Sequence, residues 1–156
     1  MKEPQCLSAV ARFHQTFKHP VLAEPRIPSP SRCQLRVDLI AEELQELKEA
    51  IDKQDLTEVA DALCDIQYVL SGAILEFGLG EKFQALFEEV QRSNMSKACK
   101  NEMEAMETVS HYQNKGIDCY FVCDQGSYLV YRSADNKTLK SIHYSPADLD
   151  NILQNP

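Results

Sequence analysis

Six carboxylates lie close together in the sequence, and their types and spacing could serve metal chemistry. The first three form the pattern Glu-Glu-x-x-Glu, and the other three follow one another at intervals of three and four residues. The six residues are Glu42, Glu43, Glu46, Glu58, Asp61 and Asp65. So many like charges repel one another unless cations neutralise them, and carboxylate oxygens suit Mg²⁺ or Mn²⁺ better than zinc. The pattern therefore predicts a divalent-cation site of the kind used by enzymes that act on polyphosphates.

Two predicted helices carry these carboxylates. Apolar residues recur with helical spacing from about residue 31 or 32 to 53, and again from about residue 55 to 77. Ser31 and Asp55 are the expected N-caps, and Gly78 is expected to end the second helix. Because the connection between the helices is short, they should pack as antiparallel neighbours. That arrangement would bring the first three acids towards the other three.

Apolar residues border both groups of acids, so both groups lie beside surfaces that we expect to pack. The stripe on the first helix consists of Val37, Ile40, Leu44, Leu47 and Ile51. The stripe on the second helix includes Val59, Leu63, Ile66 and Leu70. The alternative is a solvated helix surface, of which the i,i+4 pair Glu49 and Lys53 is typical. Two adjoining acidic groups beside packing surfaces favour metal binding over that alternative.

The remaining pattern predicts an all-α fold, an antiparallel helical bundle with a small C-terminal β-hairpin appendage. Further helices are expected at about 5–17, 81–91 and 101–114. Prolines at four positions make residues 19–31 an extended connector. We expect a single domain over residues 1–156, with its helical core at about 5–97 and a helical link and hairpin tail at about 98–156.

The predicted hairpin lies in the last third of the chain. Two short runs rich in aromatic and β-branched residues, 119–122 and 128–131, are expected to form its strands. The four residues Asp124–Ser127 are expected to connect them. Residues 145–149 are interpreted as a short cap or turn.

Composition limits the kind of protein this can be. The chain has 156 residues, a net charge of −8 and no stripe rich in Lys and Arg, which disfavours binding along a nucleic-acid backbone. No apolar run is long enough to span a membrane, and the first residues lead into no signal-peptide core. Its six cysteines form neither a CxxC pair nor a short disulfide framework, so we expect reduced thiols and a cytoplasmic location.

Two histidines near the N-terminus raise the question of a transition-metal site. His14 and His19 are five residues apart, a spacing that does not stack them on one helix, and Pro20 follows at once. We therefore interpret His14 as a packed polar residue or as a minor part of a substrate pocket.

Several motifs along the chain belong to one family pattern. The acids stand as Glu42-Glu43-x-x-Glu46 followed by Glu58-x-x-Asp61, within a longer matching string that continues to Val69. Later matching segments are Arg92–Lys97, Asn136–Lys140 and Tyr144-x-Pro146. On these residues the chain resembles the all-α nucleoside triphosphate pyrophosphohydrolases, and within them the MazG-like branch. This superfamily also includes dimeric dUTPases and phosphoribosyl-ATP pyrophosphohydrolase. The resemblance spans about residues 13–149, but the segment 98–115 is longer than the usual link.

The resemblance implies a helical bundle that is active as a homodimer or as a tetramer of two dimers. It implies that Mg²⁺ is held by Glu42, Glu43, Glu46, Glu58 and Asp61, with Asp65 joining or supporting the site. It further implies that Asn94 and Lys97 contact the substrate, with Lys97 on phosphate, and that Tyr68 packs near the base or sugar. Lys140 is another candidate for substrate binding and could reach a neighbouring subunit's site.

The implied reaction hydrolyses a nucleoside triphosphate, expected to be a dNTP, at the α–β phosphoanhydride bond. The products are a nucleoside monophosphate and pyrophosphate, and the implied role is to sanitise the nucleotide pool. One of Glu42, Glu43 and Glu46 would take the proton of the attacking water, and the sequence leaves open which one. Two alternatives remain. One is an enzyme of the phosphoribosyl-ATP pyrophosphohydrolase type, and the other is a non-catalytic, metal-binding helical regulatory module.

Overall fold

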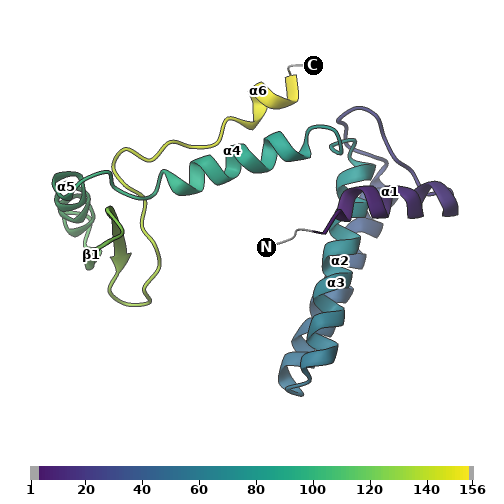
Figure 1. Cartoon of the computed structure of the whole chain (residues 1–156), viewed down its shortest axis with the longest axis horizontal. Coiled ribbons are helices and arrows are strands. Elements are labelled where there is room, and N and C mark those ends of the chain that lie inside the picture. The colour runs from purple at the N-terminus through teal and green to yellow at the C-terminus, as the bar shows by residue number, and fades with distance from the viewer. Residues whose placement is uncertain (1–3, 155–156) are drawn as a thin grey trace. The chain divides into compact units, whose positions relative to one another are not determined.

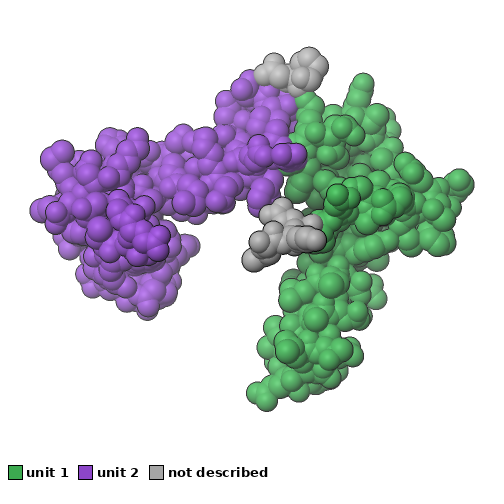
Figure 2. All heavy atoms as spheres, viewed as in Figure 1, with its two compact units in different colours: residues 1–83 green, residues 84–156 purple. Residues whose placement is uncertain are grey.

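The computed structural model describes residues 4–154, which fall into two compact units (Figure 2). Unit 1 comprises residues 1–83 and unit 2 comprises residues 84–156. Each unit is described by itself below. Among the described residues, none of the helices combines the length and the apolar character that a membrane span requires.

Unit 1 is built from three helices. These are α1 (Cys6–Phe17), α2 (Pro30–Asp52) and α3 (Leu56–Glu76). The two long helices α2 and α3 lie side by side as a helical hairpin, and α1 packs against α3 (Figure 1). The predicted antiparallel pair that carries the acids is therefore present.

The two long helices begin in different ways, and only α3 has a side chain that caps its first turn. Asp55 is the N-cap of α3, as predicted, and its side chain accepts hydrogen bonds from the backbone N–H groups of Thr57 and Glu58. The predicted cap of α2 was wrong. Its N-cap is Ser29 instead of Ser31, because Pro30 is well suited to the first helical position, where its fixed φ fits and no N–H is needed.

The C-terminal end of α3 is closed in two ways. Gly78 has a φ of +69°, and the N–H groups of Gly78 and Leu79 donate to Leu75 and Ile74, which completes a Schellman motif. The proline-containing connector then passes over this end, where the N–H group of Leu22 also donates to the Leu75 carbonyl oxygen and that of Arg26 donates to the Phe77 carbonyl oxygen. A Cβ at Gly78 would lie only 1.9 Å from a connector carbonyl oxygen, so glycine is required here for space as well as for φ.

The apolar stripes of the two long helices are only partly covered within the chain. Val37, Leu44 and Ile51 on α2 are 61%, 59% and 56% exposed. On α3, Leu63 and Leu70 are exposed as well. The stripes were expected to pack, and only their other members, such as Ile40 and Ile66, are half-buried.

Unit 2 combines three helices with one hairpin. Its elements are α4 (Phe83–Met95), α5 (Glu102–Gln113), β1 (Cys119–Asp124), β2 (Ser127–Arg132) and α6 (Leu149–Gln154). The predicted helical link and C-terminal hairpin are confirmed, whereas α6 was not predicted, because the expected cap or turn covered residues 145–149. Isolated bridges from Cys99 and Thr138 cover the outer edge of β2.

The hairpin turn is tighter than predicted. Asp124 pairs directly with Ser127, so only Gln125 and Gly126 form the turn. Both have positive φ, 48° and 82°, which is the backbone that a two-residue hairpin turn with matching strand twist requires. The four-residue connection was therefore an overestimate by one residue at each end.

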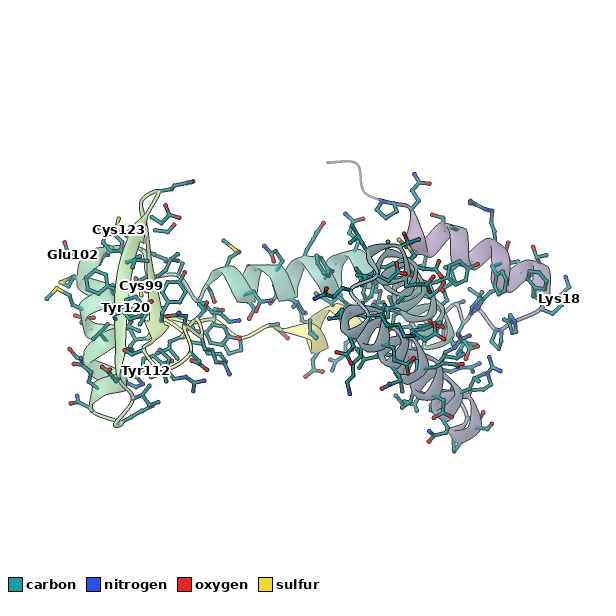
Figure 3. All side chains as sticks on the ribbon, turned by 90° about the horizontal axis from the view of Figure 1, so that it is seen from below. Lys18, Cys99, Glu102, Tyr112, Tyr120 and Cys123 are labelled. Carbon is teal, nitrogen blue, oxygen red and sulfur yellow. The ribbon has the colours of Figure 1, made fainter. Side chains whose placement is uncertain are left out.

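An apolar core lies between α5 and the hairpin. Its buried residues are Cys99, Ala105, Cys119, Val130 and Leu139 (Figure 3 labels Cys99). Tyr112, Phe121 and Tyr128 pack against this cluster. Unit 2 thus buries a core of its own, contributed by segments on both sides of the hairpin.

Candidate active site

The structure gathers the six predicted carboxylates along the α2–α3 pair. Glu46, Glu58 and Asp61 line one cavity of about 290 Å³. Glu43 and Asp65 line another, of about 320 Å³. Glu42 lines neither cavity, but it is one of the charged neighbours of Glu43 on the same helix.

The electrostatics of Glu43 show that these acids act on one another. Burial raises the pKa of Glu43, and the negative charges of Asp65, Glu46, Glu42 and Asp61 raise it further. Acids from both helices contribute, so the two sequence groups do face each other. These carboxylates are oxygen donors of like charge, which is the donor chemistry that Mg²⁺ prefers.

The carboxylates do not converge on a single point. Over residues 4–154, no three His, Cys, Asp or Glu side chains are arranged closely enough to hold one metal ion together. The donor chemistry therefore fits Mg²⁺, while the side-chain positions leave the acids spread over two cavities. Aspartate and glutamate side chains have rotatable bonds, and it is these that would have to turn for the acids to converge.

The cavity of about 320 Å³ also has aromatic walls. Phe13, His19 and Tyr68 line it together with Glu43 and Asp65. The rings of Phe13 and Tyr68 meet edge to face with centroids 5.5 Å apart, and Phe13 stacks on His19 at 5.9 Å. The structure thus places Tyr68 beside two of the acids, in a cavity with both flat apolar surfaces and charge.

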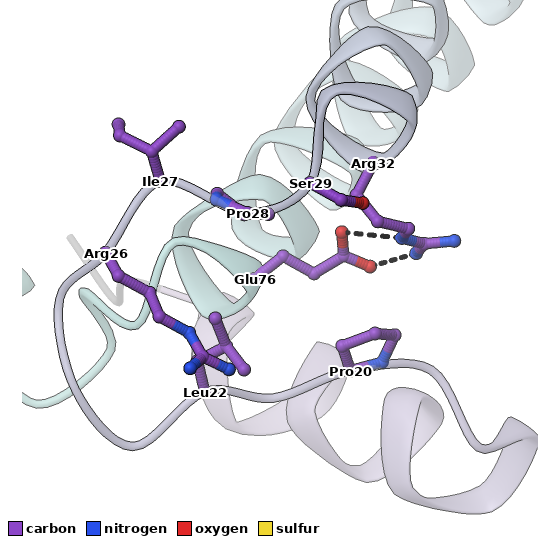
Figure 4. A pocket seen from close by; sticks show the side chains of 8 residues that line it. All are labelled: Pro20, Leu22, Arg26, Ile27, Pro28, Ser29, Arg32 and Glu76. Atoms are coloured by element: carbon purple, nitrogen blue, oxygen red, sulfur yellow. Dashed lines mark hydrogen bonds and ion pairs between the residues drawn. The ribbon is translucent and has the colours of Figure 1, made fainter.

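A buried charged network lies next to this cavity. Arg36, which lines it, is 7% exposed and donates from Nη2 to Glu76 Oε1 at 2.6 Å. Arg32 forms an ion pair with the same carboxylate. Arg32 and Glu76 also line a separate cavity of about 380 Å³ (Figure 4). Burial raises the pKa of Glu76, but the hydrogen bonds from the two arginines outweigh this and hold the pKa below its ordinary value.

His14 completes the network as a neutral base. Burial lowers the pKa of His14, and its Nδ1 lies 2.8 Å from the Pro20 carbonyl oxygen, to which it must donate. Nε2 is then the acceptor that faces Arg36 Nη2 at 3.4 Å. The first predicted alternative, a packed polar residue, is confirmed, since His14 is 3% exposed, and His14 also lines the cavity of about 320 Å³.

Sequence reasoning missed the pairing of Arg36 with Glu76. The signal was Gly72, a glycine in the interior of a long helix, which often marks a close approach. A Cβ at Gly72 would lie 2.8 Å from Arg36 Nη1 and 3.1 Å from His14 Nε2. Arg36 Nε has no hydrogen-bond partner among the described residues, so this buried donor still has a bond to make.

The predicted lysines lie in unit 2, around the end of α4. Lys97 Nζ donates to Asn94 Oδ1 at 2.8 Å, so these two predicted residues are in contact. Lys140 Nζ lies 4.0 Å from the centroid of the Tyr144 ring. The Tyr144 hydroxyl is 2.9 Å from Ser93 Oγ.

Tyr144 shows that the two lysines share one environment. The hydrogen bond with Ser93 lowers the pKa of Tyr144, and the positive charges of Lys140 and Lys97 lower it further. Asn94, Lys97 and Lys140 were predicted, whereas Ser93 and Tyr144 had been noticed only as parts of matching motifs. Together they form a cluster with two ammonium groups and hydroxyl donors, which can bind an anion.

Comparisons with known proteins show that residues 10–94, which include the six acids, match a family. A relative, the uncharacterized protein L479 of Acanthamoeba polyphaga mimivirus, is 25% identical over 94% of each chain, and so the similarity continues well beyond α4. The model of the phosphoribosyl-ATP pyrophosphohydrolase family matches residues 10–94, which contain all six carboxylates and Asn94. The chain therefore belongs to this family, within the MazG-like all-α nucleoside triphosphate pyrophosphohydrolase superfamily of hydrolases that act on acid anhydrides.

Proposed function

We propose that the chain is a Mg²⁺-dependent pyrophosphohydrolase of nucleoside triphosphates, with dNTPs as the expected substrates. It would cleave the α–β phosphoanhydride bond to a nucleoside monophosphate and pyrophosphate, and so sanitise the nucleotide pool. The observation that carries this proposal is that acids of α2 and α3 line the same cavities and raise the pKa of Glu43, within the residues that match the family. Such a set of acids needs a cation, and a cation so placed attracts phosphate.

The acids of unit 1 would divide between metal binding and proton transfer. The proposed ligands are Glu42, Glu43, Glu46, Glu58 and Asp61, with Asp65 joining or supporting them. When bound, Mg²⁺ would supply neutralising charge for the phosphates and lower the pKa of water. One of Glu42, Glu43 and Glu46 would accept the proton of the attacking water.

The cavity with aromatic walls suits the nucleoside part of the substrate. Phe13 and Tyr68 offer ring surfaces for a base, and the unpartnered Nε of Arg36 offers a donor to a carbonyl oxygen. Because Glu43 and Asp65 line the same cavity, a nucleoside bound there would have its phosphates near the acids.

The lysine cluster of unit 2 suits the phosphates. Lys97 and Lys140 would balance the charge that develops on the triphosphate, and Asn94 would orient Lys97 or contact the substrate itself. Lys140 could serve its own chain or the site of a neighbouring subunit.

The exposed apolar stripes support a homodimer or a homotetramer. Val37, Leu44 and Ile51 recur at intervals of seven residues, and so do Leu56, Leu63 and Leu70 on α3. A seven-residue repeat is typical of helices that pack lengthwise against other helices. A second copy of this chain, offering the same two stripes, is the proposed cover.

The test is pyrophosphate release from a panel of NTPs, dNTPs and phosphoribosyl-ATP, with Mg²⁺ and with excess EDTA. We expect turnover of a nucleoside triphosphate in Mg²⁺ and none in EDTA. Preference for phosphoribosyl-ATP would instead favour the activity for which the family model is named. If the folded protein turned over no compound, the chain would be a non-catalytic regulatory module.

A further inference from the structure

Helix α5 presents one polar face to the segment that carries Lys140. Glu104, Thr108 and Tyr112 follow one another at intervals of four residues, so they lie along the same side of the helix. All three belong to the part of the chain beyond the family match, which ends at residue 94. A helix in this position therefore calls for a role of its own.

Each of these three side chains makes a hydrogen bond to a successive residue of the tail. Tyr112 donates from its hydroxyl to the Lys140 carbonyl oxygen at 3.1 Å. Glu104 Oε1 accepts from the Ser141 hydroxyl. Thr108 Oγ1 accepts from the Ile142 N–H at 3.2 Å and itself donates to the Glu104 carbonyl oxygen. Three consecutive tail residues are thus held by three consecutive turns of one helix.

The centre of this contact is a buried carboxylate. Glu104 is only 6% exposed, and its second oxygen accepts from the Lys100 N–H at 3.1 Å. Burial raises the pKa of Glu104, but the hydrogen bonds from Ser141 and Lys100 and the positive charges of His143 and Lys100 hold it below its ordinary value. These hydrogen bonds hold Ser141 and Lys100 in place, because breaking them would leave the buried carboxylate of Glu104 without partners, which is energetically costly.

The same tail segment is fastened on its other side to the end of α4. The Ser141 N–H donates to the Lys97 carbonyl oxygen at 3.1 Å, and the Ser145 N–H donates to Ser96 Oγ at 2.9 Å. The hydroxyls of Tyr144 and Ser93 meet at 2.9 Å. The backbone around Lys140 is therefore held from both sides, while the Lys140 side chain itself stays exposed.

We propose that α5 is a positioning element that holds Lys140 beside Lys97 for phosphate binding, through Glu104, Thr108 and Tyr112. The inference rests on the proposed function only in taking the two lysines as the phosphate-binding groups. A lysine on a loose tail loses conformational freedom when it binds, and a backbone that is already fixed removes much of that cost. The helix thus acts on the ligand through Lys140 without touching it.

The test is a double-mutant cycle on the full chain, with inorganic tripolyphosphate in Mg²⁺ as the probe and calorimetric Kd as the readout. Tyr112→Phe removes one hydroxyl and keeps the ring that packs on the core. Its matched control is Tyr120→Phe, which removes a similar hydroxyl bonded to Asn136 in the same unit (both tyrosines are labelled in Figure 3). Lys140→Ala and the double variant Tyr112→Phe/Lys140→Ala complete the set.

We expect Lys140→Ala to weaken tripolyphosphate binding about tenfold, as for the loss of a charged hydrogen bond. Tyr112→Phe should weaken it about threefold, as for the loss of a neutral one. In the Lys140→Ala background the second substitution should have no further effect, and Tyr120→Phe should bind as wild type does. The inference is overturned if Tyr112→Phe binds normally, if it weakens binding equally with and without Lys140, or if the wild type does not bind the probe.

A second variant and a separate assay keep these outcomes distinct. Glu104→Ala should weaken tripolyphosphate binding more than Tyr112→Phe does, and the tyrosine variant still decides if Glu104→Ala fails to fold. A wild type that binds tripolyphosphate with the expected coupling but hydrolyses no nucleotide would contradict the proposed function and leave the positioning role intact.

Discussion

The two units differ in how their charged groups are supported. Unit 1 presents its acids on two long helices whose apolar stripes remain partly exposed, and the neighbouring acids raise the pKa of Glu43. Unit 2 carries its lysines on segments fixed by a closed core and by hydrogen bonds to a helix. The proposed function would complete the acids with a cation and cover the stripes with a second copy of the chain, whereas the segments that carry the lysines are already held within unit 2.

One carboxylate from each unit, Glu43 and Glu104, shows the same contrast in the pKa of its side chain. Glu43 has neighbours of its own sign, and so its ionised form is disfavoured. Glu104 is surrounded by donors and positive charge, so its ionised form is favoured. The first situation is the one expected of a carboxylate that binds a ligand, and the second is the one expected of a carboxylate that stabilises the fold.

The largest expected effect comes from an acid of unit 1. Glu46→Gln removes one charge from the cavity that it shares with Glu58 and Asp61, and should lower kcat about 100-fold or more, as for a charged group that acts in the transition state. Pyrophosphate release at saturating nucleotide and Mg²⁺ measures this. The control is Asp38→Asn on the same helix, an exposed acid bonded to Gln34 that should leave kcat unchanged. Equal losses in both variants would mean that Glu46 has no special role.

Next in size is a pair of glycine substitutions, one in each unit. Gly78→Ala and Gly116→Ala both force alanine to a positive φ, at +69° and +75°, but only at Gly78 would the new Cβ strike the connector backbone. We expect Gly116→Ala to cost about 1–2 kcal/mol of unfolding free energy and Gly78→Ala about 2 kcal/mol more. Urea unfolding of the two variants measures the difference. Equal losses would show that the connector does not press on the end of α3.

A smaller effect is expected from the lysines of unit 2. Lys97→Ala should raise KM for the nucleotide about tenfold, because a charge-assisted contact to phosphate is lost. Steady-state kinetics measure it, with Lys115→Ala, an exposed lysine just after α5, as the control. An unchanged KM in Lys97→Ala would contradict the proposed role of Lys97 in substrate binding.

The smallest effects are opposite pH dependences of stability. Because the pKa of Glu43 is raised in the folded chain, its ionisation between acid and neutral pH destabilises the fold. Glu43→Gln should therefore raise the melting temperature at pH 7 but not near pH 4. The lowered pKa of Glu104 contributes stability above the ordinary glutamate pKa that is lost as the pH falls, so Glu104→Gln should lower the melting temperature at pH 7 and matter less in acid. Thermal unfolding at both pH values in a chelator measures this. Shifts of the same sign would contradict the contrast between the units.

Local chemistry made much of the fold predictable from the sequence. Asp55 caps α3 and Gly78 ends it, because each follows from the conformational preferences of a single residue. The hairpin strands were predicted from their composition, but the tight turn at Gln125 and Gly126 was not, since its length depends on how the strands pair. The start of α2 was missed because Pro30 was assigned to the connector instead of the first turn.

Contacts between distant residues could not be predicted in this way. Arg36 and Glu76 are 40 residues apart and meet only when α2 and α3 are folded together. The hydrogen bond from the Ser141 hydroxyl to Glu104 likewise forms only because the tail folds back onto α5. The apolar stripes were recognised correctly, but a periodic pattern does not show whether the same chain or another copy covers it.

The connector that passes over the end of α3 has a consequence for hydrogen exchange. Proline has no N–H, and a proline-containing connector would ordinarily leave its few amides open to solvent. Here the Leu22 and Arg26 amides donate to carbonyls at the end of α3. Their protons should therefore exchange only when the last turn of α3 opens, and two loop amides become local reporters of how often that helix end frays.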